Sequence, residues 1–549
     1  MTDYVSLLRN FIKSEGADAI LINSADEFLS EYNQLPKNSR YKVTAFSGST
    51  GDCVVTQDRV FLFVDGRYHE QADNEVNHDV VTVVKLKQGE SNINSIVDVL
   101  KNNITLIVTA NKVSVSFAEN ISESAKSKNI KIKFINYDPV DDKSCQENNS
   151  ELIFVSEKIT KYSPEQKFRS LGLKDGQYLV ITYPCDFAYF TNLRNYDFPY
   201  SSAPRAKAII SEKSVTLYTD ADVPYKFDGL SVKKLSSFGE DLSEIKNSTL
   251  FIDKQNINYS DFTAVDKSNS ISASEVFEAK SHKNENEIEH LKEAFKATDR
   301  VVFKMNRLIN ESENITEYDL FCAINRFFKE EGAVAQSFKP IIASGSNSSI
   351  IHYSFASDKK TIKDGELVMV DCGGYFEGGL ATDITRTFIK GTPNEGQKHV
   401  YTMVLKAFIK AYTKKYTEDA TWFDIDNTAR EFLKTEEKTG YLFNHSTGHG
   451  IGISVHERPP ICAPFDAYKQ KFDKNYVFSI EPGLYKAGEG GVRLENAVYT
   501  EQISPELKIT ALSHYPFEEK LIDFSLLDDF EKNFLNEWQE YGRQNNLIV

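Results

Sequence analysis

The sequence predicts an α/β protein, with α+β character, that is built from several domains. The chain has 549 residues, too many for a single hydrophobic core, so about two to four domains are expected. Its first half alternates amphipathic stretches with short apolar runs, as helices and strands do in turn. In its second half, apolar strands separated by glycine turns end repeatedly in acidic residues.

The first predicted domain covers residues 1–150. An amphipathic helix is expected over 4–13, and strands are expected over 17–22, 53–56 and 60–64. The polar stretch from Asp141 to Ser150 has the composition of a linker.

The second predicted domain covers residues 151–273 and repeats this pattern. Strands are expected over 178–182, 208–210 and 215–218, with a helix or turn over 186–193. In both predicted domains a pair of strands is followed by an Asp residue, and this repeated pattern suggests a duplicated α/β unit. The self-similarity is weak, and chance reuse of common elements explains it equally well.

The third predicted domain covers residues 274–549 and begins beyond the Ser- and Asn-rich boundary at 267–274. The apolar spacing predicts a long helix over 285–311, and Thr316-Glu317-Tyr318-Asp319 resembles a capping box that opens a second helix. From Pro340 to Glu495, mostly strands and glycine turns are expected. A last amphipathic helix is expected over 525–542.

Composition excludes several classes of function. The formal net charge is −16, with 80 acidic and 64 basic residues, which argues against a nucleic-acid or anionic-membrane surface. The six cysteines are far apart and contain no C-x-x-C pair, so free thiols in a reducing compartment are expected. No signal peptide and no membrane span are expected, and the predicted location is the cytoplasm.

Two acidic residues stand where a hairpin would bring them together. Asp371 ends the apolar strand that starts at Glu366, and Asp383 opens an alternating strand that runs to Phe388. Two carboxylates placed this closely repel each other unless a cation lies between them. Taken alone, two surface Asp residues beside a turn are an equally good interpretation.

Three further residues extend this pattern. His449 lies between glycines, outside any dinucleotide fingerprint or H-E-x-x-H motif. Glu481 and Glu495 each follow an apolar strand, and a buried acid needs a partner. A salt bridge to Arg493 would serve one of them but not four carboxylates. Four carboxylates with a single imidazole suit Mn, Zn or Co, and a pair of such ions can share bridging carboxylates.

Together these segments resemble the aminopeptidase P family, whose members cleave Xaa-Pro bonds at the amino terminus of peptides. The resemblance implies two creatinase-like α/β domains followed by a pita-bread catalytic domain with a C-terminal extension. The family's two-Asp, one-His, two-Glu metal pattern falls on Asp371, Asp383, His449, Glu481 and Glu495. Phe46-Ser47-Gly48-Ser49-Thr50-Gly51 and Val64-Asp65-Gly66-Arg67-Tyr68 resemble the first domain, and Phe187-Ala188-Tyr189-Phe190-Thr191-Asn192-Leu193-Arg194 resembles the second.

The resemblance also implies roles for individual residues. Two divalent ions are expected, manganese first, with zinc or cobalt as alternatives, and a hydroxide that bridges them would attack the substrate. Glu481 would accept a proton, and His352 and His456 would contact the scissile carbonyl. The residues expected to line the proline pocket or to orient the ligands are His445, Tyr485 and Arg493.

The expected partners are peptides with proline in the second position, and the expected assembly is a homodimer. Two alternatives stay open. The first is a prolidase restricted to Xaa-Pro dipeptides. The second is a metal-free pita-bread protein that binds peptides or other partners, although relatives of that kind lack metal ligands.

Overall fold

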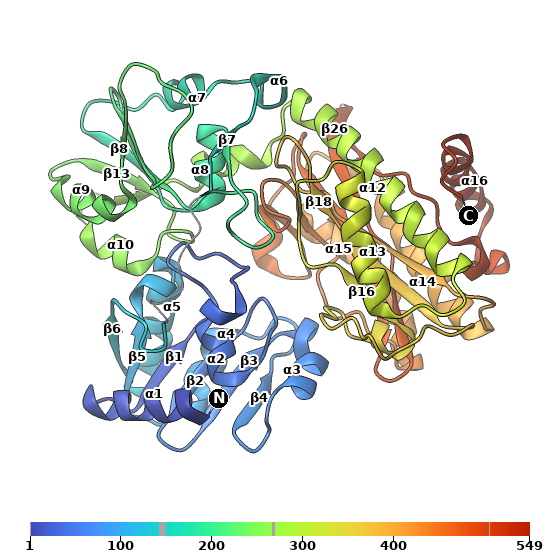
Figure 1. Ribbon diagram of the computed structural model, residues 1–549, viewed down its shortest axis with the longest axis horizontal. Coiled ribbons are helices and arrows are strands. Elements are labelled where there is room, and N and C mark those ends of the chain that lie inside the picture. The colour runs from blue at the N-terminus through green and yellow to red at the C-terminus, as the bar shows by residue number, and fades with distance from the viewer. Residues whose placement is uncertain (1, 142–149, 266–269, 504, 549) are drawn as a thin grey trace. The chain divides into compact units, whose positions relative to one another are not determined.

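The computed structural model describes residues 2–141, 150–265, 270–503 and 505–548 (Figure 1). The predicted linker at 141–150 lies, apart from its two ends, outside the described residues, as does part of the boundary at 267–274. The chain divides into two compact units. The N-terminal unit comprises Met1–Val155 and Tyr162–Ala279, and the C-terminal unit comprises Ser156–Lys161 and Lys280–Val549. The three-domain boundaries stay a prediction.

A six-stranded sheet forms the first part of the N-terminal unit, in the order β4-β3-β2-β1-β5-β6. The central strand β1 is antiparallel to β2 and parallel to β5. The strands are β1 (Ala19–Ile22), β2 (Asp52–Thr56), β3 (Val60–Val64), β4 (Val81–Lys85), β5 (Thr105–Thr109) and β6 (Lys131–Ile135). The predicted helix is α1 (Thr2–Ser14), and Gly16, with φ of 61°, turns the chain into β1. The predicted elements of this region are therefore confirmed.

A second six-stranded sheet follows, in the order β12-β11-β10-β8-β13-β14. Its strands are β8 (Gln177–Ile181), β10 (Lys207–Ser211), β11 (Val215–Tyr218), β12 (Leu230–Lys233), β13 (Thr249–Ile252) and β14 (Ser270–Ser272). Each neighbouring pair has the same parallel or antiparallel sense as its counterpart in the first sheet. The two parts therefore share one topology, which the sequence pattern left open.

The C-terminal unit contains two larger sheets and a hairpin. One sheet has the order β16-β17-β19, the other has the order β20-β27-β26-β23-β21-β22, and β24 pairs with β25. The strands that carry the site are β16 (Ile341–Ser344), β17 (Leu367–Cys372), β19 (Ile384–Ile389), β21 (Gly448–Gly450), β22 (Glu457–Cys462), β23 (Val477–Ile480), β24 (Gly483–Lys486), β25 (Gly490–Arg493) and β26 (Asn496–Ile503). The six-stranded sheet is completed by β20 (Tyr416–Thr417) and β27 (Glu506–Ala511).

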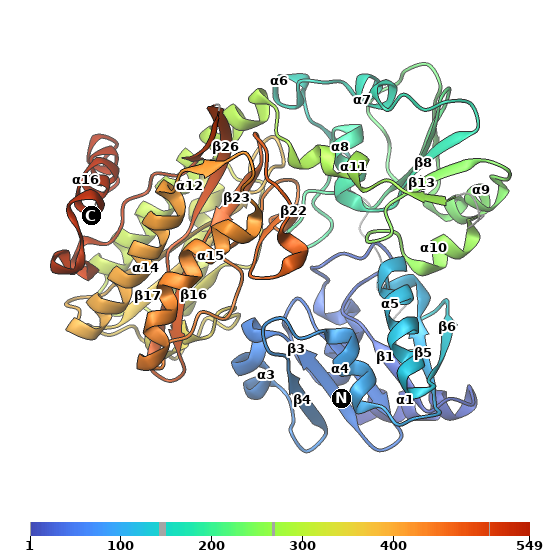
Figure 2. The same ribbon diagram turned by 180° about the vertical axis from the view of Figure 1, so that it is seen from behind.

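Helices cover these sheets and form two apolar clusters with them. α12 (Glu285–Glu311) and α13 (Glu317–Glu330) pack with β16, β17 and β19 around residues such as Val302, Met305 and Val370. α14 (Glu395–Thr413) and α15 (Trp422–Leu433), which lie side by side in Figure 2, pack with β23, β25 and β26. The site strands are thus enclosed by helices.

Capping residues explain where the predicted helices begin. α12 matches its predicted range, and Asn284 and Glu287 form a capping box at its start. The predicted capping box of Thr316 and Asp319 opens α13. The last helix, α16 (Asp529–Gln544), begins four residues later than predicted because Asp528 is its N-cap.

The prediction of mostly strands between Pro340 and Glu495 is wrong for α14 and α15, which lie inside this stretch. α14 is buried on more than one face, so its apolar residues do not form a single stripe. The helical spacing is nevertheless present at Val400, Val404 and Phe408. The prediction missed it because most of the surrounding stretch has the pattern of strands.

A short segment, Ser156–Lys161, lies between the two parts of the N-terminal unit in sequence but belongs to the C-terminal unit. It contains α6 (Glu157–Thr160). The Asn284 side chain donates to the Thr160 carbonyl oxygen at 3.1 Å, and Lys161 pairs with Glu285 at 2.6 Å. This segment therefore holds the start of α12.

The described cysteines are free thiols: Cys53, Cys185, Cys372 and Cys462 are buried, and Cys322 is exposed. This agrees with the expectation of free thiols. Among the described residues, none of the helices has the length and apolar character needed to cross a membrane.

Candidate metal centre

Asp371 and Asp383 lie at the ends of two paired strands, as predicted. β17 and β19 are antiparallel, with Asp371 opposite Thr385 and Cys372 opposite Ile384. Asp383 directly precedes β19. The pairing therefore places both carboxylates at one end of the sheet.

Neighbouring strands of the larger sheet carry the other three candidates. His449 lies within β21, Glu481 follows β23, and Glu495 precedes β26. β23 pairs with both β21 and β26, so these three residues come from adjacent strands.

The candidate ligand atoms lie close together. His449 Nε2 is 3.5 Å from Asp383 Oδ2 and 3.5 Å from Glu481 Oε1. One ligand atom each of Asp383, His449 and Glu495 lies within 4.8 Å of the other two. Asp371, Asp383 and Glu495 are 7%, 4% and 2% exposed, so water offers them little solvation.

The charges of this cluster fit a bound cation. Burial, followed by the charges of Glu495 and Asp371, raises the pKa of Asp383 well above its ordinary value. Burial and the neighbouring acids also raise the pKa of Glu495, and burial raises that of Glu481 to about 7. Each carboxyl thus holds its proton more tightly than in water, and a cation in the proton's place would relieve the repulsion.

Two buried carboxylate oxygens point to the same conclusion. Among the described residues, Asp371 Oδ1 and Glu495 Oε1 have no hydrogen-bond partner. Buried polar atoms of this kind call for an explanation, and a metal ion is one. The side chains of Asp371, Asp383, His449, Glu481 and Glu495 therefore fit divalent ions.

Hydrogen bonding prepares His449 for metal binding. Its Nδ1 lies 3.1 Å from the Gly450 carbonyl oxygen, which can only accept, so Nδ1 carries the proton. In the neutral ring, Nε2 then presents its lone pair toward Asp383 and Glu481. Metal-binding histidines commonly use this arrangement.

Arg493 pairs with Asp371, and not with the glutamates that the sequence offered as partners. Its Nη2 donates to Asp371 Oδ2, and its Nε donates to the Thr385 hydroxyl at 3.1 Å. The Thr385 hydroxyl in turn donates to Glu495 Oε2 at 2.7 Å. The simple salt-bridge interpretation therefore leaves Asp383, Glu481 and Glu495 without a cation.

Sequence reasoning missed Thr385 and the fully buried Arg386. Arg386 donates to the carbonyl oxygens of Thr385 (2.9 Å) and Glu495 (2.6 Å) and to the Asn496 side chain (2.8 Å). It thereby holds the backbone that presents Glu495. The sequence signal that could have identified Thr385 and Arg386 was their position in the strand that begins directly after Asp383.

A chain of hydrogen bonds joins the predicted pocket residues. Arg493 Nη1 donates to the Tyr485 hydroxyl at 2.8 Å, and that hydroxyl lies 2.8 Å from His445 Nε2. His445 Nδ1 lies 2.8 Å from the Ser446 carbonyl oxygen and so carries the proton. Tyr485 therefore donates to His445, and the structure brings all three residues together beside Asp371.

The remaining histidines lie on loops near the centre. The rings of His456 and His449 meet edge to face, with centroids 4.5 Å apart. His352 follows Ile351, whose carbonyl oxygen accepts from Arg493 Nη1 at 3.3 Å. Glu457, next to His456, is buried and pairs with Lys283. His352 is thus linked to the centre through Ile351, and His456 is linked to it through its own ring contact with His449.

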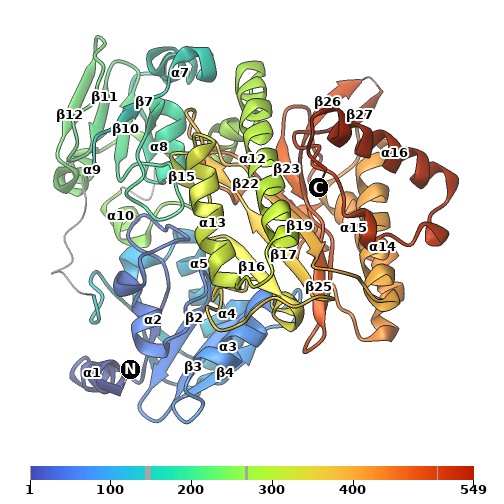
Figure 3. The ribbon, with the colours of Figure 1, turned by 45° about the vertical axis from the view of Figure 1, so that its right-hand side comes forward.

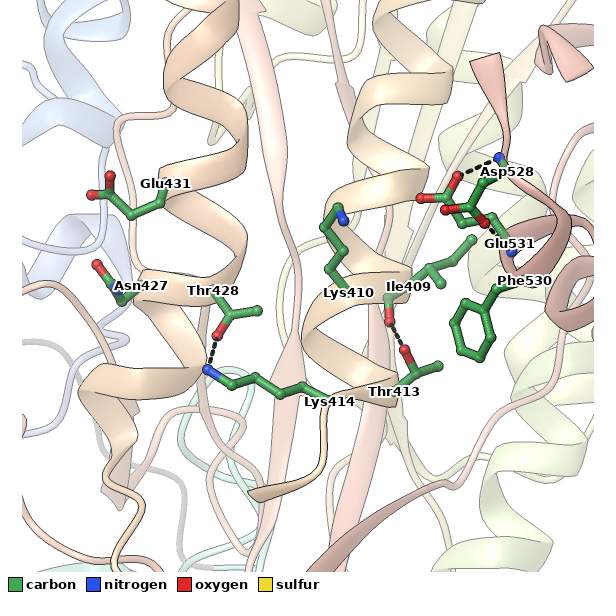
Figure 4. Close-up of a pocket in the computed structure, with 10 residues that line it drawn as sticks. All are labelled: Ile409, Lys410, Thr413, Lys414, Asn427, Thr428, Glu431, Asp528, Phe530 and Glu531. Carbon is green, nitrogen blue, oxygen red and sulfur yellow. Dashed lines mark hydrogen bonds between the residues drawn. The ribbon is translucent and has the colours of Figure 1, made fainter. Parts of the chain in front are cut away.

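A separate pocket of about 490 Å³ lies between α14, α15 and the start of α16 (Figure 4). Lys410, Lys414, Glu431 and Phe530 are among its lining residues. It includes none of the predicted site residues, so we do not assign it to the metal centre.

Family models match three successive parts of the chain. Residues 289–502 match metallopeptidase family M24, and residues 5–142 and 142–287 match creatinase/prolidase N-terminal domains.

Proteins with similar sequences match over nearly the whole length. A probable Xaa-Pro aminopeptidase P of Paracoccidioides brasiliensis is 28% identical over 588 residues, which cover 97% of this chain and 93% of that protein. A probable Xaa-Pro aminopeptidase P of Sordaria macrospora is 27% identical and covers 99% of this chain and 96% of its own.

Solved structures agree on the fold. An X-prolyl aminopeptidase of Caenorhabditis elegans, described as a cytosolic enzyme with a di-nuclear active site, superposes with a TM-score of 0.90 at 21% identity. The match covers 100% of this chain and 97% of that one. A prolidase of Thermococcus sibiricus, at 26% identity and a TM-score of 0.51, covers 66% of this chain and 97% of its own.

These findings confirm the predicted α/β fold and the family resemblance. Residues 289–502 thus match the M24 metallopeptidase domain, and two matches to creatinase/prolidase N-terminal domains precede it in the chain.

Proposed function

We propose that this protein is a metal-dependent aminopeptidase that releases the first residue of peptides with proline in the second position. The observation that carries the proposal is the convergence of the Asp383, Glu481 and Glu495 carboxyl groups on His449, with the charge of the buried Asp371 acting on Asp383. The nearly full-length match to Xaa-Pro aminopeptidases P supports this substrate class.

We propose that two divalent ions, with manganese as the physiological metal, occupy the centre. Asp371 would bind one ion, Asp383 and Glu495 would be shared, and His449 and Glu481 would each complete one site. When bound, such ions lower the pKa of a water molecule and polarise the scissile carbonyl.

The protein's own residues supply the remaining steps. Glu481, partly exposed at the end of β23, accepts a proton during attack and delivers it to the leaving proline nitrogen. His352 and His456 donate hydrogen bonds to the scissile carbonyl oxygen as negative charge develops on it. Arg493 and Thr385 hold Asp371 and Glu495 in place throughout.

The chain of Arg493, Tyr485 and His445 forms one wall of the proposed proline pocket. Tyr485 already donates to His445, so these side chains are kept in fixed directions. Proline forms a tertiary amide without an N–H, so a pocket for it must not depend on that donor. A general aminopeptidase whose pocket needs an N–H donor from the second residue would therefore not cleave the peptide bond before proline.

We further propose that the enzyme works in the cytosol as a homodimer. The described free thiols agree with a reducing compartment. The cytosolic relative from C. elegans has the same fold, which supports this location.

Turnover of a matched pair of peptides tests the function. The manganese-loaded protein is offered an Xaa-Pro-Pro tripeptide and the corresponding Xaa-Pro dipeptide. Release of the first residue from the tripeptide, with slow dipeptide cleavage, is expected. Cleavage of the dipeptide alone would establish the prolidase alternative, whose solved relative matches only part of the chain.

Metal-site variants test the mechanism. Asp383→Ala and Glu495→Ala should each lose bound metal, measured by elemental analysis, together with turnover. Full activity in both variants would refute the two-metal centre. Wild-type protein that binds no metal would support the alternative of a metal-free binding protein.

A further inference from the structure

Glu317 is a buried carboxylate that, within the described part of the chain, accepts its hydrogen bonds from a single loop. It is the first residue of α13 and is 0% exposed. α13 packs against β16, and the loop runs from the end of β16 at Ser344 to Ser357 (Figure 3). Among the described residues, Glu317 forms no ion pair, so neutral donors alone stabilise its charge.

The two carboxylate oxygens hold different parts of this loop. Oε1 accepts from the Ser344 backbone N–H at 2.7 Å, from the Ser344 hydroxyl at 2.8 Å and from the Asn347 amide at 2.9 Å. Oε2 accepts from the Tyr353 hydroxyl at 2.8 Å, from the Ser357 backbone N–H at 3.1 Å and, at 3.2 Å, from the same Asn347 amide. One side chain thus holds the beginning, the middle and the end of the loop.

The loop held in this way carries His352. Tyr353, directly after His352, is bound to Glu317, and the carbonyl oxygen of Ile351, directly before it, accepts from Arg493. Arg493 in turn donates to Asp371. The backbone around His352 is therefore fixed on one side to the metal centre and on the other to Glu317.

A second contact sets how far the loop can move toward the centre. The Gly491 backbone N–H donates to the Ser348 hydroxyl at 2.8 Å, and a Cβ at Gly491 would lie 2.5 Å from the Ser348 carbonyl oxygen. The loop rests on β25, the strand that ends in Arg493. Glu317 holds the loop on the side opposite to β25.

We propose that Glu317 is a positioning residue that sets the location of His352 relative to the scissile carbonyl. The role of His352 rests on the proposed function. The hydrogen bonds that Glu317 accepts from the loop are independent of the proposed function, because they concern the position of the loop and not the reaction. Misplacement of a reacting group by about 1 Å can slow catalysis about 100-fold, so the loop need not unfold to matter.

A double-mutant cycle separates positioning from general damage. Glu317→Gln keeps the shape of the side chain but leaves one oxygen acceptor, and it should lower kcat about 10- to 100-fold with a smaller change in KM. In a His352→Ala background, the same change should lower kcat less than about threefold. Manganese content should stay that of the wild type. Glu330→Gln, an exposed substitution on the same helix, serves as the control and should behave as the wild type.

Hydrogen exchange tests the loop without reference to turnover. In Glu317→Gln, the backbone amides of Ser344 and Ser357 should exchange at least about tenfold faster than in the wild type or Glu330→Gln. Tyr353→Phe, which removes only the hydroxyl, should repeat part of the kcat loss with an intact fold.

The outcomes distinguish this proposal from the proposed function. Equal kcat losses with and without His352, or unchanged exchange at Ser344 and Ser357, would overturn the role of Glu317. A metal-loaded wild type that cleaves neither peptide would overturn the proposed function, and faster exchange in Glu317→Gln would still support the loop contact.

Discussion

Replacing Thr385 by Val should weaken metal binding while preserving the shape of the core. The two side chains have nearly the same volume, and Thr385 is 0% exposed, so no cavity opens and little water can enter. The change removes one hydroxyl that donates to Glu495 Oε2 at 2.7 Å and accepts from Arg493 Nε at 3.1 Å.

The expected magnitude follows from these two contacts. A hydrogen bond to a charged group stabilises by about 1.5–3 kcal/mol. Metal binding replaces the proton that the buried Glu495 holds tightly and leaves a charged carboxylate, so this bond is stronger with metal than without it, and its loss should raise the dissociation constant for manganese about 10- to 100-fold. The Arg493 contact is lost with or without metal, so it should lower the free energy of unfolding of both forms.

Calorimetric titration of the metal-free protein with manganese measures this effect. Thr387→Val is the matched control, because Thr387 lies on the same strand and is equally buried, and because its hydroxyl forms its hydrogen bonds among the described residues with the Arg493 backbone. The control should lose stability but change manganese affinity less than about threefold. Wild-type affinity in Thr385→Val, or equal weakening in both variants, would refute the assignment of Thr385 as the support of Glu495.

Three further predictions concern pH, a buried ion pair and a histidine. Metal-free protein should lose at least on the order of 3 kcal/mol of unfolding free energy as pH rises from about 5 to 8, because the folded state holds a proton on Glu481 (pKa raised from 4.5 to about 7) that the unfolded chain releases, and the raised pKa values of Asp383 and Glu495 act in the same direction. Urea titrations at several pH values measure this loss, saturating manganese should abolish it, and a flat profile would contradict it. Lys283→Met should lower the free energy of unfolding by about 3–5 kcal/mol, because it leaves Glu457 buried and unpaired. Adding Glu457→Leu to this variant should recover much of the lost free energy of unfolding, as measured in thermal melts. No recovery would argue against the Lys283–Glu457 ion pair as the cause of the loss. His456→Ala should lower kcat about 100-fold in peptide assays at unchanged metal content, and an unchanged kcat would remove His456 from the mechanism.

The metal-ligand candidates could be predicted because strand ends are visible in the sequence. An apolar run that stops at Asp371 or Glu481 marks both a strand and the side chain at its end. Antiparallel pairing of neighbouring strands then brings such ends together, as β17 and β19 show. The apolar spacing and the capping residues likewise sufficed for α12 and α13.

The supporting residues could not be predicted, because their roles depend on partners far away in the sequence. Arg386 reaches the Tyr515 carbonyl oxygen 129 residues away, and the Thr385 hydroxyl reaches Glu495 110 residues away. Glu317 looks like an ordinary first-turn acid of a helix, whose place is usually at the surface. Only the tertiary structure shows that it is buried and which loop it holds.

The path of the chain decides how this protein can be shortened. Because Ser156–Lys161 belongs to the C-terminal unit, the chain enters that unit, leaves it and returns at Lys280. A fragment that starts at Lys280 would lack α6 and would expose the first turn of α12, where Asn284 meets Thr160. A self-sufficient peptidase fragment would have to keep Ser156–Lys161 and replace residues 162–279 with a linker.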